Sequence, residues 1–258
     1  MRKIKVGAVS YLNTKPLIYG FGQGMMQDEV ELILDYPSSI AGMLLEDEID
    51  LGLVPVAIIP RLRESHIISD YCIGADGEVG SVLLASDVPI HHIQNILLDY
   101  QSRTSVILAQ VLAEKYWKIT PQFHDTRENY ESIIGGTTAG IIIGDRTFAL
   151  KSKFKYIYDL AHEWKLFTNL PFVFACWVAN KDIDRSFVKR FNEALRFGLM
   201  NSETVVAEFK KESGAEFDVK DYLENKISYA FDERKKFAME LFLTYAKEIV
   251  ENEVMKIV

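Results

Sequence analysis

Short apolar runs alternate with amphipathic segments along roughly the first 180 residues of the chain. Apolar runs of strand length bounded by Gly, Pro, Ser or Asp are typical of buried strands. Such runs occupy residues 4–10, 31–36, 50–55, 80–86, 95–100, 140–145 and 170–180. Helical spacing between them predicts helices over residues 15–24, 37–48 and 102–117, and Ser38 or Ser39 is expected to cap the second of these. Because strands and helices alternate, the pattern predicts an α/β fold with a largely parallel sheet.

After residue 182 the pattern becomes entirely helical. Phe187, Phe191, Leu195 and Leu199 recur every four residues, which predicts one helix face turned toward the core. We expect two or three further helices, the last over about residues 231–252. The chain therefore predicts an α/β part followed by a C-terminal helical segment.

The order of these elements predicts two lobes. We expect one lobe to comprise residues 1–86 and 174–258, including the C-terminal helices, and the other to comprise residues 87–173. Ligands of open α/β sheets bind beyond the carboxyl ends of the strands. Two such lobes predict a ligand cleft between them that closes around its occupant.

Composition and charge narrow the classes of partner. The 258 residues carry a net charge of −8, with acidic and basic residues interspersed. Such a surface disfavours nucleic acid and anionic membranes, because phosphate binding needs a concentrated basic face. No apolar window of about 18 residues is present, and the N-terminus lacks the apolar run of a signal peptide. Cys72 and Cys176 lie about 100 residues apart and are expected to be free, buried thiols instead of a disulfide, which favours a cytoplasmic protein.

Polar side chains gather where the predicted strands end. Each alone is most often a helix cap, but several at the same end of successive strands favour a ligand site. The candidates are Ser10, Tyr11 and Asn13 after the first strand, Ser38 after the second, Ser81 in the run 77–86, Ser102, Arg103, Thr104 and Ser105 after residues 95–100, and Gly144 and Asp145 after residues 140–143.

The stretch Ser102–Ser105 is the most suggestive of these. A helix N-terminus presents unpaired N–H groups and a partial positive charge. Hydroxyl donors and the Arg103 cation would complete a site for a carboxylate or a phosphate. A capped helix with a solvated arginine is the alternative. Asp145 could likewise orient a ligand hydroxyl or merely cap the helix that follows it.

Several familiar motifs are absent from the sequence. The glycines of residues 20–24 follow a helix and lack the spacing of a dinucleotide fingerprint. There is no Walker A sequence and no Gly-x-Ser-x-Gly elbow. The histidines are scattered without metal-ligand spacing, so we expect no metal site.

Five blocks together resemble chorismate dehydratase, an enzyme family of the futalosine route to menaquinone. They are VSYLNTKPL (9–17), CIGADGEVGSVLL (72–84), DYQSRTSV (99–106), GIIIGD (140–145) and LPFVFACW (170–177). The resemblance implies a two-lobed periplasmic-binding-protein-like (type II) fold with a C-terminal helical segment, in a cytoplasmic enzyme. The sequence does not indicate whether it would be a monomer or a homodimer.

The same resemblance implies a hydro-lyase that converts the dicarboxylate chorismate to 3-[(1-carboxyvinyl)oxy]benzoate and water without a cofactor. The substrate's own enolpyruvyl carboxylate would take the C3 proton, while Asn13 and Ser81 position that group as catalytic residues. The Ser102–Ser105 stretch would hold one carboxylate. Tyr11, Phe172 and Phe174 are candidates to flank the ring, although the two phenylalanines are more typical of a core.

The chain departs from the family pattern at Glu78-Val79-Gly80, where arginine or proline is common. A cation such as Lys15 or Arg103 would then replace that arginine. Asp145 is the alternative proton acceptor. Alternative functions are the sister enzyme 1,4-dihydroxy-6-naphthoate synthase, whose Ser-Pro-Cys type of motif is missing here, and a small-anion-binding protein of the same fold, for which we expect an export signal that the sequence lacks.

Overall fold

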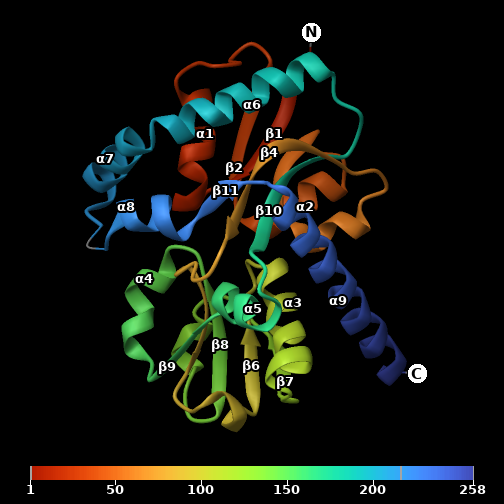
Figure 1. The fold of residues 1–258 in the computed structure, drawn as a ribbon, viewed down its shortest axis with the longest axis vertical. Coiled ribbons are helices and arrows are strands. Elements are labelled where there is room, and N and C mark those ends of the chain that lie inside the picture. The colour runs from red at the N-terminus through yellow and green to blue at the C-terminus, as the bar shows by residue number, and fades with distance from the viewer. Residues whose placement is uncertain (1, 216, 258) are drawn as a thin grey trace. The chain divides into compact units, whose positions relative to one another are not determined.

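The computed structural model describes residues 2–215 and 217–257, the side chains of 151 and 250–257 excepted. The chain forms two units, which we call unit 1 (Met1–Gly74 and Val173–Asp232) and unit 2 (Ala75–Phe172 and Glu233–Val258). This division differs from the expected lobes, because residues 75–86 and 233–258 belong to unit 2 (Figure 1). The chain passes between the units three times, where two passages were expected.

Unit 1 contains a six-stranded sheet in the order β11-β4-β10-β3-β1-β2. Its strands are β1 Ile4–Val9, β2 Val30–Asp35, β3 Leu51–Pro55, β4 His66–Ala75, β10 Phe172–Ala179 and β11 Ser228–Ala230. β1 is parallel to β2 and β3, whereas β10 is antiparallel to β3, and β11 to β4. The sheet is mixed rather than largely parallel because β10 enters it from unit 2, in the opposite direction.

Helices cover this sheet and extend beyond it. They are α1 Lys15–Gly22, α2 Pro37–Leu45, α6 Arg185–Met200, α7 Ser202–Ser213 and α8 Val219–Asp221, with shorter helical turns at Leu12–Thr14, Val56–Arg61 and Tyr222–Lys226. The expected stripe on α6 is confirmed for Phe187, Phe191 and Leu195, which are buried, whereas Leu199 is half-buried. The Phe191 ring packs 5.0 Å from that of Trp177 on β10. The expectation of helix alone after residue 182 is wrong, because β11 completes the edge of the sheet.

Unit 2 contains a five-stranded sheet in the order β7-β6-β8-β5-β9. Its strands are β5 Val82–Ser86, β6 Asn95–Leu98, β7 Gln122–Asp125, β8 Thr138–Ile143 and β9 Tyr156–Asp159. β6 is parallel to β7 and β8, and β5 is antiparallel to β8 and β9. Because β5 lies between two strands of this sheet, it cannot belong to the first lobe as expected.

The helices of unit 2 include the C-terminal helix. They are α3 Thr104–Val111, which continues as a π-helix over Leu112–Trp117, α4 Arg146–Leu150, α5 Leu160–Thr168 and α9 Glu233–Ile257, with short turns at Ile90–His92, Tyr130–Ile133 and Lys151–Lys153. The Phe242 ring of α9 lies 5.1 Å from Phe172 and 6.2 Å from Trp164 of α5. Lys115 also pairs with Glu248 at 2.8 Å. These contacts place α9 in unit 2 instead of the first lobe.

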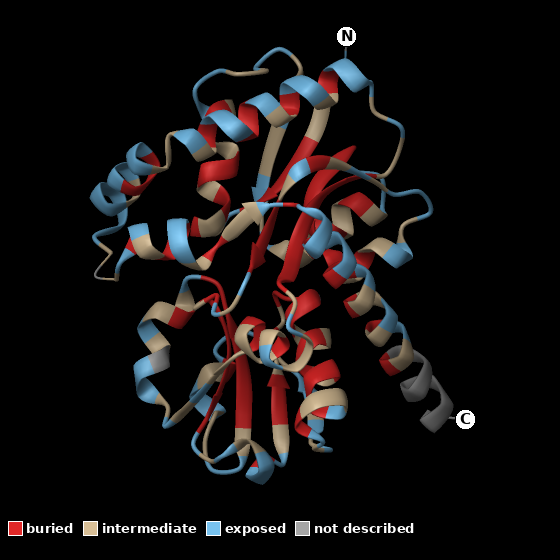
Figure 2. Ribbon diagram, in the orientation of Figure 1, coloured by how far each residue is buried: buried red, intermediate tan, exposed pale blue. Residues whose placement is uncertain are grey.

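The central strands supply most of the core in each unit. Every residue of β3, β5 and β10 is buried, and β10 is red in Figure 2. Cys72 and Cys176 are buried thiols and are not joined in a disulfide, as expected. Burial raises the pKa of the Cys176 thiol. Within the described part of the chain, no helix is both long and apolar enough to span a membrane.

Candidate functional site

The carboxyl ends of β1 and β2 bring four predicted site residues to one edge of the unit 1 sheet. The strands are parallel with Val9 opposite Asp35, so the chain leaves both at the same edge. The Ser10 N–H donates to the Asp35 carbonyl at 3.0 Å. Ser38 is half-buried in the first turn of α2. The expected serine cap is wrong, because Tyr36 precedes the helix and Pro37 begins it.

Buried residues and hydrogen bonds hold the turn from Ser10 to Thr14 in place. Leu12 and Thr14 are buried, while Ser10 is exposed and Tyr11 and Asn13 are half-buried. The Tyr229 hydroxyl donates to the Asn13 carbonyl at 2.9 Å, and the Thr14 hydroxyl donates to the Asn13 side-chain oxygen at 3.4 Å. This turn therefore presents accessible polar side chains on a fixed backbone.

Lys15, one candidate cation, contacts α7. Its ammonium lies 3.6 Å from the Glu212 carboxylate and 5.3 Å from the centre of the Phe209 ring.

Phe172, a candidate to flank a ligand ring, is 1% exposed inside the aromatic cluster with Trp164 and Phe242. Phe172 is a core residue, which is the alternative that the sequence left open.

The predicted residues of unit 2 lie along one edge of its own sheet. β8 and β6 end at this edge, and β5 begins there because it is antiparallel to β8. The Gly144 N–H donates to the Ser81 carbonyl at 2.9 Å, which brings these two residues together. Gly144 has φ +66°, a conformation that glycine adopts at little cost, and it turns the chain from β8 into α4. Asp145 is exposed beside it, and Ser81 is 1% exposed.

The start of α3 follows the predicted pattern of a capped helix. The Ser102 hydroxyl oxygen accepts the Ser105 N–H at 3.1 Å. Ser102, Thr104 and Ser105 are all buried, and Arg103 is exposed. The helix N-terminus carries a partial positive charge, to which the exposed guanidinium adds. This arrangement suits an anion, although Ser102 itself is engaged in the cap.

Asp159, which sequence analysis missed, fixes the loop before Ser81. One carboxylate oxygen accepts the N–H groups of Val79 and Gly80 at 3.0 and 2.6 Å. The other accepts those of Ala161 and His162, both at 3.1 Å, and so caps α5. Burial raises the pKa of Asp159, and these backbone donors oppose that rise. The departure from the family pattern at residues 78–80 is thus a segment held in place by the carboxylate of the half-buried Asp159.

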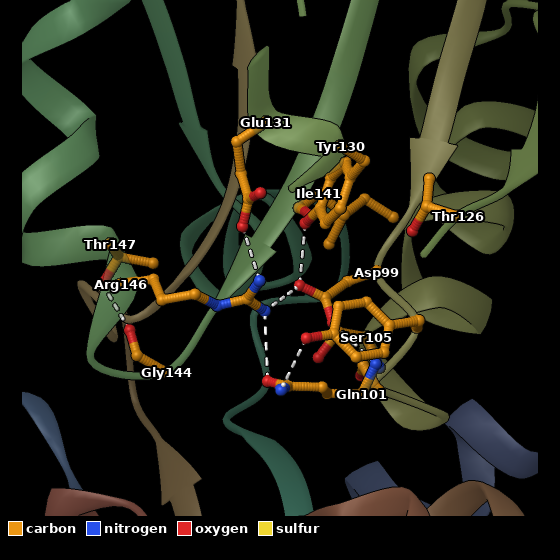
Figure 3. Close-up of polar contacts among 12 residues, drawn as sticks. Asp99, Gln101, Ser105, Thr126, Tyr130, Glu131, Ile141, Gly144, Arg146 and Thr147 are labelled. Atoms are coloured by element: carbon orange, nitrogen blue, oxygen red, sulfur yellow. Dashed lines mark hydrogen bonds and ion pairs between the residues drawn. The ribbon is translucent and has the colours of Figure 1, made fainter. Parts of the chain in front are cut away.

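A second group that sequence analysis missed surrounds Asp99, directly after β6 (Figure 3). Its carboxylate accepts the Gln101 N–H at 2.8 Å, the Tyr130 hydroxyl at 2.8 Å and Arg146 Nη2 at 2.5 Å. Burial raises the pKa of Asp99, while the Arg146 charge and the hydrogen bonds lower it. Burial also raises the pKa of Tyr130 far above its usual range, so this hydroxyl stays protonated.

Arg146 begins α4 and joins several parts of this group. Nη1 donates to Glu131 at 2.5 Å, and Nη2 also donates to the Gln101 side-chain oxygen at 3.2 Å. The guanidinium carbon lies 5.7 Å from the centre of the Tyr100 ring. Asp99 and Arg146 each follow one of two adjacent parallel strands, and that was the available sequence signal. Within the described part of the chain, no cluster of three or more His, Cys, Asp or Glu residues could hold a metal ion.

Comparison with solved structures identifies the fold. Protein AF1704 from Archaeoglobus fulgidus matches with a TM-score of 0.71 at 13% identity, over 98% of both chains. The CA3427 gene product of Candida albicans, described as having the generic periplasmic binding protein fold, matches with a TM-score of 0.62 at 14% identity, over 97% of this chain and 90% of that one. The aliphatic sulphonate binding protein SsuA from Escherichia coli matches with a TM-score of 0.61 at 14% identity, over 98% and 94%. The chain has the two-sheet periplasmic-binding-protein fold with a C-terminal helix.

Comparison with sequences identifies the family. A chorismate dehydratase from Thermus thermophilus is 26% identical over 219 residues, which cover 77% of this chain and 79% of the relative. The family model described as menaquinone biosynthesis matches residues 4–248. The chain therefore belongs to the menaquinone biosynthesis family.

Proposed function

We propose that this chain is a chorismate dehydratase, which converts chorismate to 3-[(1-carboxyvinyl)oxy]benzoate and water. The observation that carries the proposal is the similarity to the Thermus thermophilus chorismate dehydratase along most of both chains. The match to the menaquinone biosynthesis family over residues 4–248 supports it. The polar sheet edges of both units supply groups of the kind that a small dicarboxylate needs.

The reaction removes the C4 hydroxyl as water and the C3 proton, which leaves an aromatic ring. Aromatisation supplies the driving force, so the proposal requires no cofactor. The enolpyruvyl carboxylate of the substrate accepts the C3 proton in this proposal. The protein then has to orient that carboxylate and stabilise the charge that develops.

Asn13 and Ser81 are the proposed donors to that group. Asn13 belongs to unit 1 and Ser81 to unit 2. Both lie in backbone that other residues fix, through the Tyr229 hydroxyl and the Asp159 carboxylate. Ser81 is 1% exposed, and its hydroxyl would act where water is scarce, which strengthens an electrostatic contribution.

The remaining site residues are proposed to bind rather than to react. The N-terminus of α3 holds one carboxylate of chorismate, with Arg103 as the nearby cation. The other proposed binding residues are Ser10, Tyr11 and Ser38 in unit 1, and Ser102, Thr104, Ser105, Gly144 and Asp145 in unit 2.

The test is incubation of the purified protein with chorismate, followed by loss of the diene absorbance and appearance of the aromatic ether. Asn13→Ala and Ser81→Ala should each lower kcat by about 10²–10³. Ser213→Ala and Asn225→Ala are matched controls, because both residues are exposed and their side chains bond to nearby residues in sequence, Phe209, Ala215 and Asp221. The controls should retain wild-type turnover.

Other outcomes would replace the proposal. If Asp145→Asn abolishes turnover but leaves chorismate binding intact, Asp145 is the proton acceptor. Binding of chorismate without conversion indicates a binding protein, as the names of several structural neighbours describe. If the protein neither binds nor converts chorismate, chorismate is excluded as the substrate, and the sister enzyme 1,4-dihydroxy-6-naphthoate synthase is favoured.

A further inference from the structure

The position of the α3 N-terminus depends on Asp99. Its Oδ1 atom accepts the Gln101 N–H at 2.8 Å, and its carbonyl accepts the Ser102 N–H at 3.2 Å. Ser102 in turn accepts the Ser105 N–H at 3.1 Å. These bonds run without a break from the end of β6 into the first turn of α3. They determine where the first N–H groups of the helix lie.

Arg146 holds Asp99 from the neighbouring strand. The same guanidinium nitrogen that contacts Asp99 at 2.5 Å also donates to the Gln101 side chain at 3.2 Å. Its other terminal nitrogen is held by Glu131 at 2.5 Å. Arg146 follows β8, and β8 pairs with β6, so the guanidinium joins the ends of two adjacent strands. A planar, fork-shaped group is needed for this geometry.

Arg146 is poorly suited to bind an anion directly. Asp99 and Glu131 bring two carboxylates to its single positive charge. A ligand carboxylate would have to displace one of these carboxylates from the guanidinium to bind it. The arrangement instead suits a group that orients its neighbours.

We propose that Arg146 is a positioning residue for the substrate carboxylate: by holding Asp99 and Gln101, it sets the N-terminus of α3 that receives the anion. This inference rests on the proposed function, since the anion is taken to be a carboxylate of chorismate. A carboxylate held equally in the ground state and in the transition state contributes to KM and not to kcat. Disturbing Arg146 should therefore raise KM.

Arg146→Lys is the decisive variant, because lysine keeps the charge but cannot form the fork. Hydrogen exchange should become about tenfold faster at the amides of Gln101, Ser102 and Ser105, while the rest of the chain stays protected. KM for chorismate should rise about 10- to 100-fold, with kcat within about threefold of wild type. Arg190→Lys is the matched control, since Arg190 makes a two-pronged pair with Glu29 on the exposed surface of unit 1. The control should change neither quantity.

The two readouts separate positioning from a general loss of structure. A purely structural role would lower the fraction of active protein, and hence the apparent kcat, without changing KM. Unchanged exchange at residues 99–105 would overturn the inference, as would an unchanged KM in an active enzyme. If the wild type does not convert chorismate, the proposed function fails, and hydrogen exchange still decides whether Arg146 orders this loop. Should Arg146→Lys not fold, Glu131→Gln weakens the same contact and should shift both readouts in the same direction.

Discussion

Asp159 allows a sharp test of how the loop before Ser81 is fixed, because each of its two carboxylate oxygens accepts a separate pair of backbone N–H groups. Asn in its place keeps one oxygen and so can serve one pair. The other pair, either at Val79 and Gly80 or at the start of α5, then faces an amide that cannot accept. A buried N–H left without an acceptor costs about 1–3 kcal/mol. Asp159→Asn leaves two such groups, but Gly80 is only half-buried, so the free energy of unfolding should fall by about 2–4 kcal/mol.

Asp184→Asn is the matched control for this substitution. Asp184 caps α6 through a single oxygen, Oδ1, which accepts both N–H groups, and Asn provides that oxygen equally well. The control should therefore change stability by only a few tenths of a kcal/mol. Urea unfolding of both variants and the wild type gives the comparison. If the two substitutions differ by less than about 0.5 kcal/mol, the second pair of bonds contributes nothing and the reasoning is refuted. Loss of these bonds should also displace the loop before Ser81, so Asp159→Asn should turn over chorismate more slowly at temperatures where the variant is folded.

Three further predictions concern stability. A Cβ at Gly198 would lie 1.9 Å from the Pro16 carbonyl oxygen, so Gly198→Ala should force α6 from α1 and lose about 1–3 kcal/mol in thermal unfolding, whereas Gly42→Ala, with open space on α2, should be neutral or stabilising. Phe242→Ala removes a fully buried ring of α9 and should cost about 3–5 kcal/mol, with faster proteolysis of that helix as the direct readout. Burial raises the pKa of the Asp99 carboxyl in the folded state above 3.8. The folded protein therefore binds a proton at Asp99 more tightly than the unfolded chain does. The stabilisation that results decreases as the pH rises from 3.8 to the folded-state pKa. Asp99→Asn lacks this stabilisation, so the difference in unfolding free energy between wild type and variant, measured by urea unfolding, should shrink as the pH rises across that window. A difference that grows with pH would contradict the reasoning.

The elements with long apolar runs were predictable, and the short edge strands were not. β1, β3, β8 and β10 carry continuous buried residues that any fold of this class would use as strands. β7 and β9 are four residues each and largely exposed or half-buried, so no apolar run marks them. β5 was recognised as a strand but assigned to the wrong lobe. Its sequence is equally compatible with either sheet, and only its pairing with β8 and β9 decides.

Pairing also explains why the Asp99 group escaped sequence analysis. Asp99 and Arg146 are 47 positions apart and meet because β6 and β8 are neighbours, although β7 lies between them in sequence. The strand order is a property of the folded sheet, and one sequence does not reveal it. Asp145 attracted attention as the acidic residue after β8, whereas its neighbour Arg146 makes the ion pair.

The strand-end rule alone does not explain why Ser81 lies at the same edge of the unit 2 sheet as Gly144. Ser81 precedes β5 instead of following a strand, and it reaches the edge because β5 runs against β8. Two carboxylates, those of the buried Asp99 and the half-buried Asp159, lie at the same edge, which raises the question of how it could receive an anion. The charge of Asp99 is opposed by Arg146, and that of Asp159 by backbone N–H groups, among them those at the start of α5. Both carboxylates are thus used to shape loops, while the α3 N-terminus and the exposed Arg103 remain for the ligand that we propose.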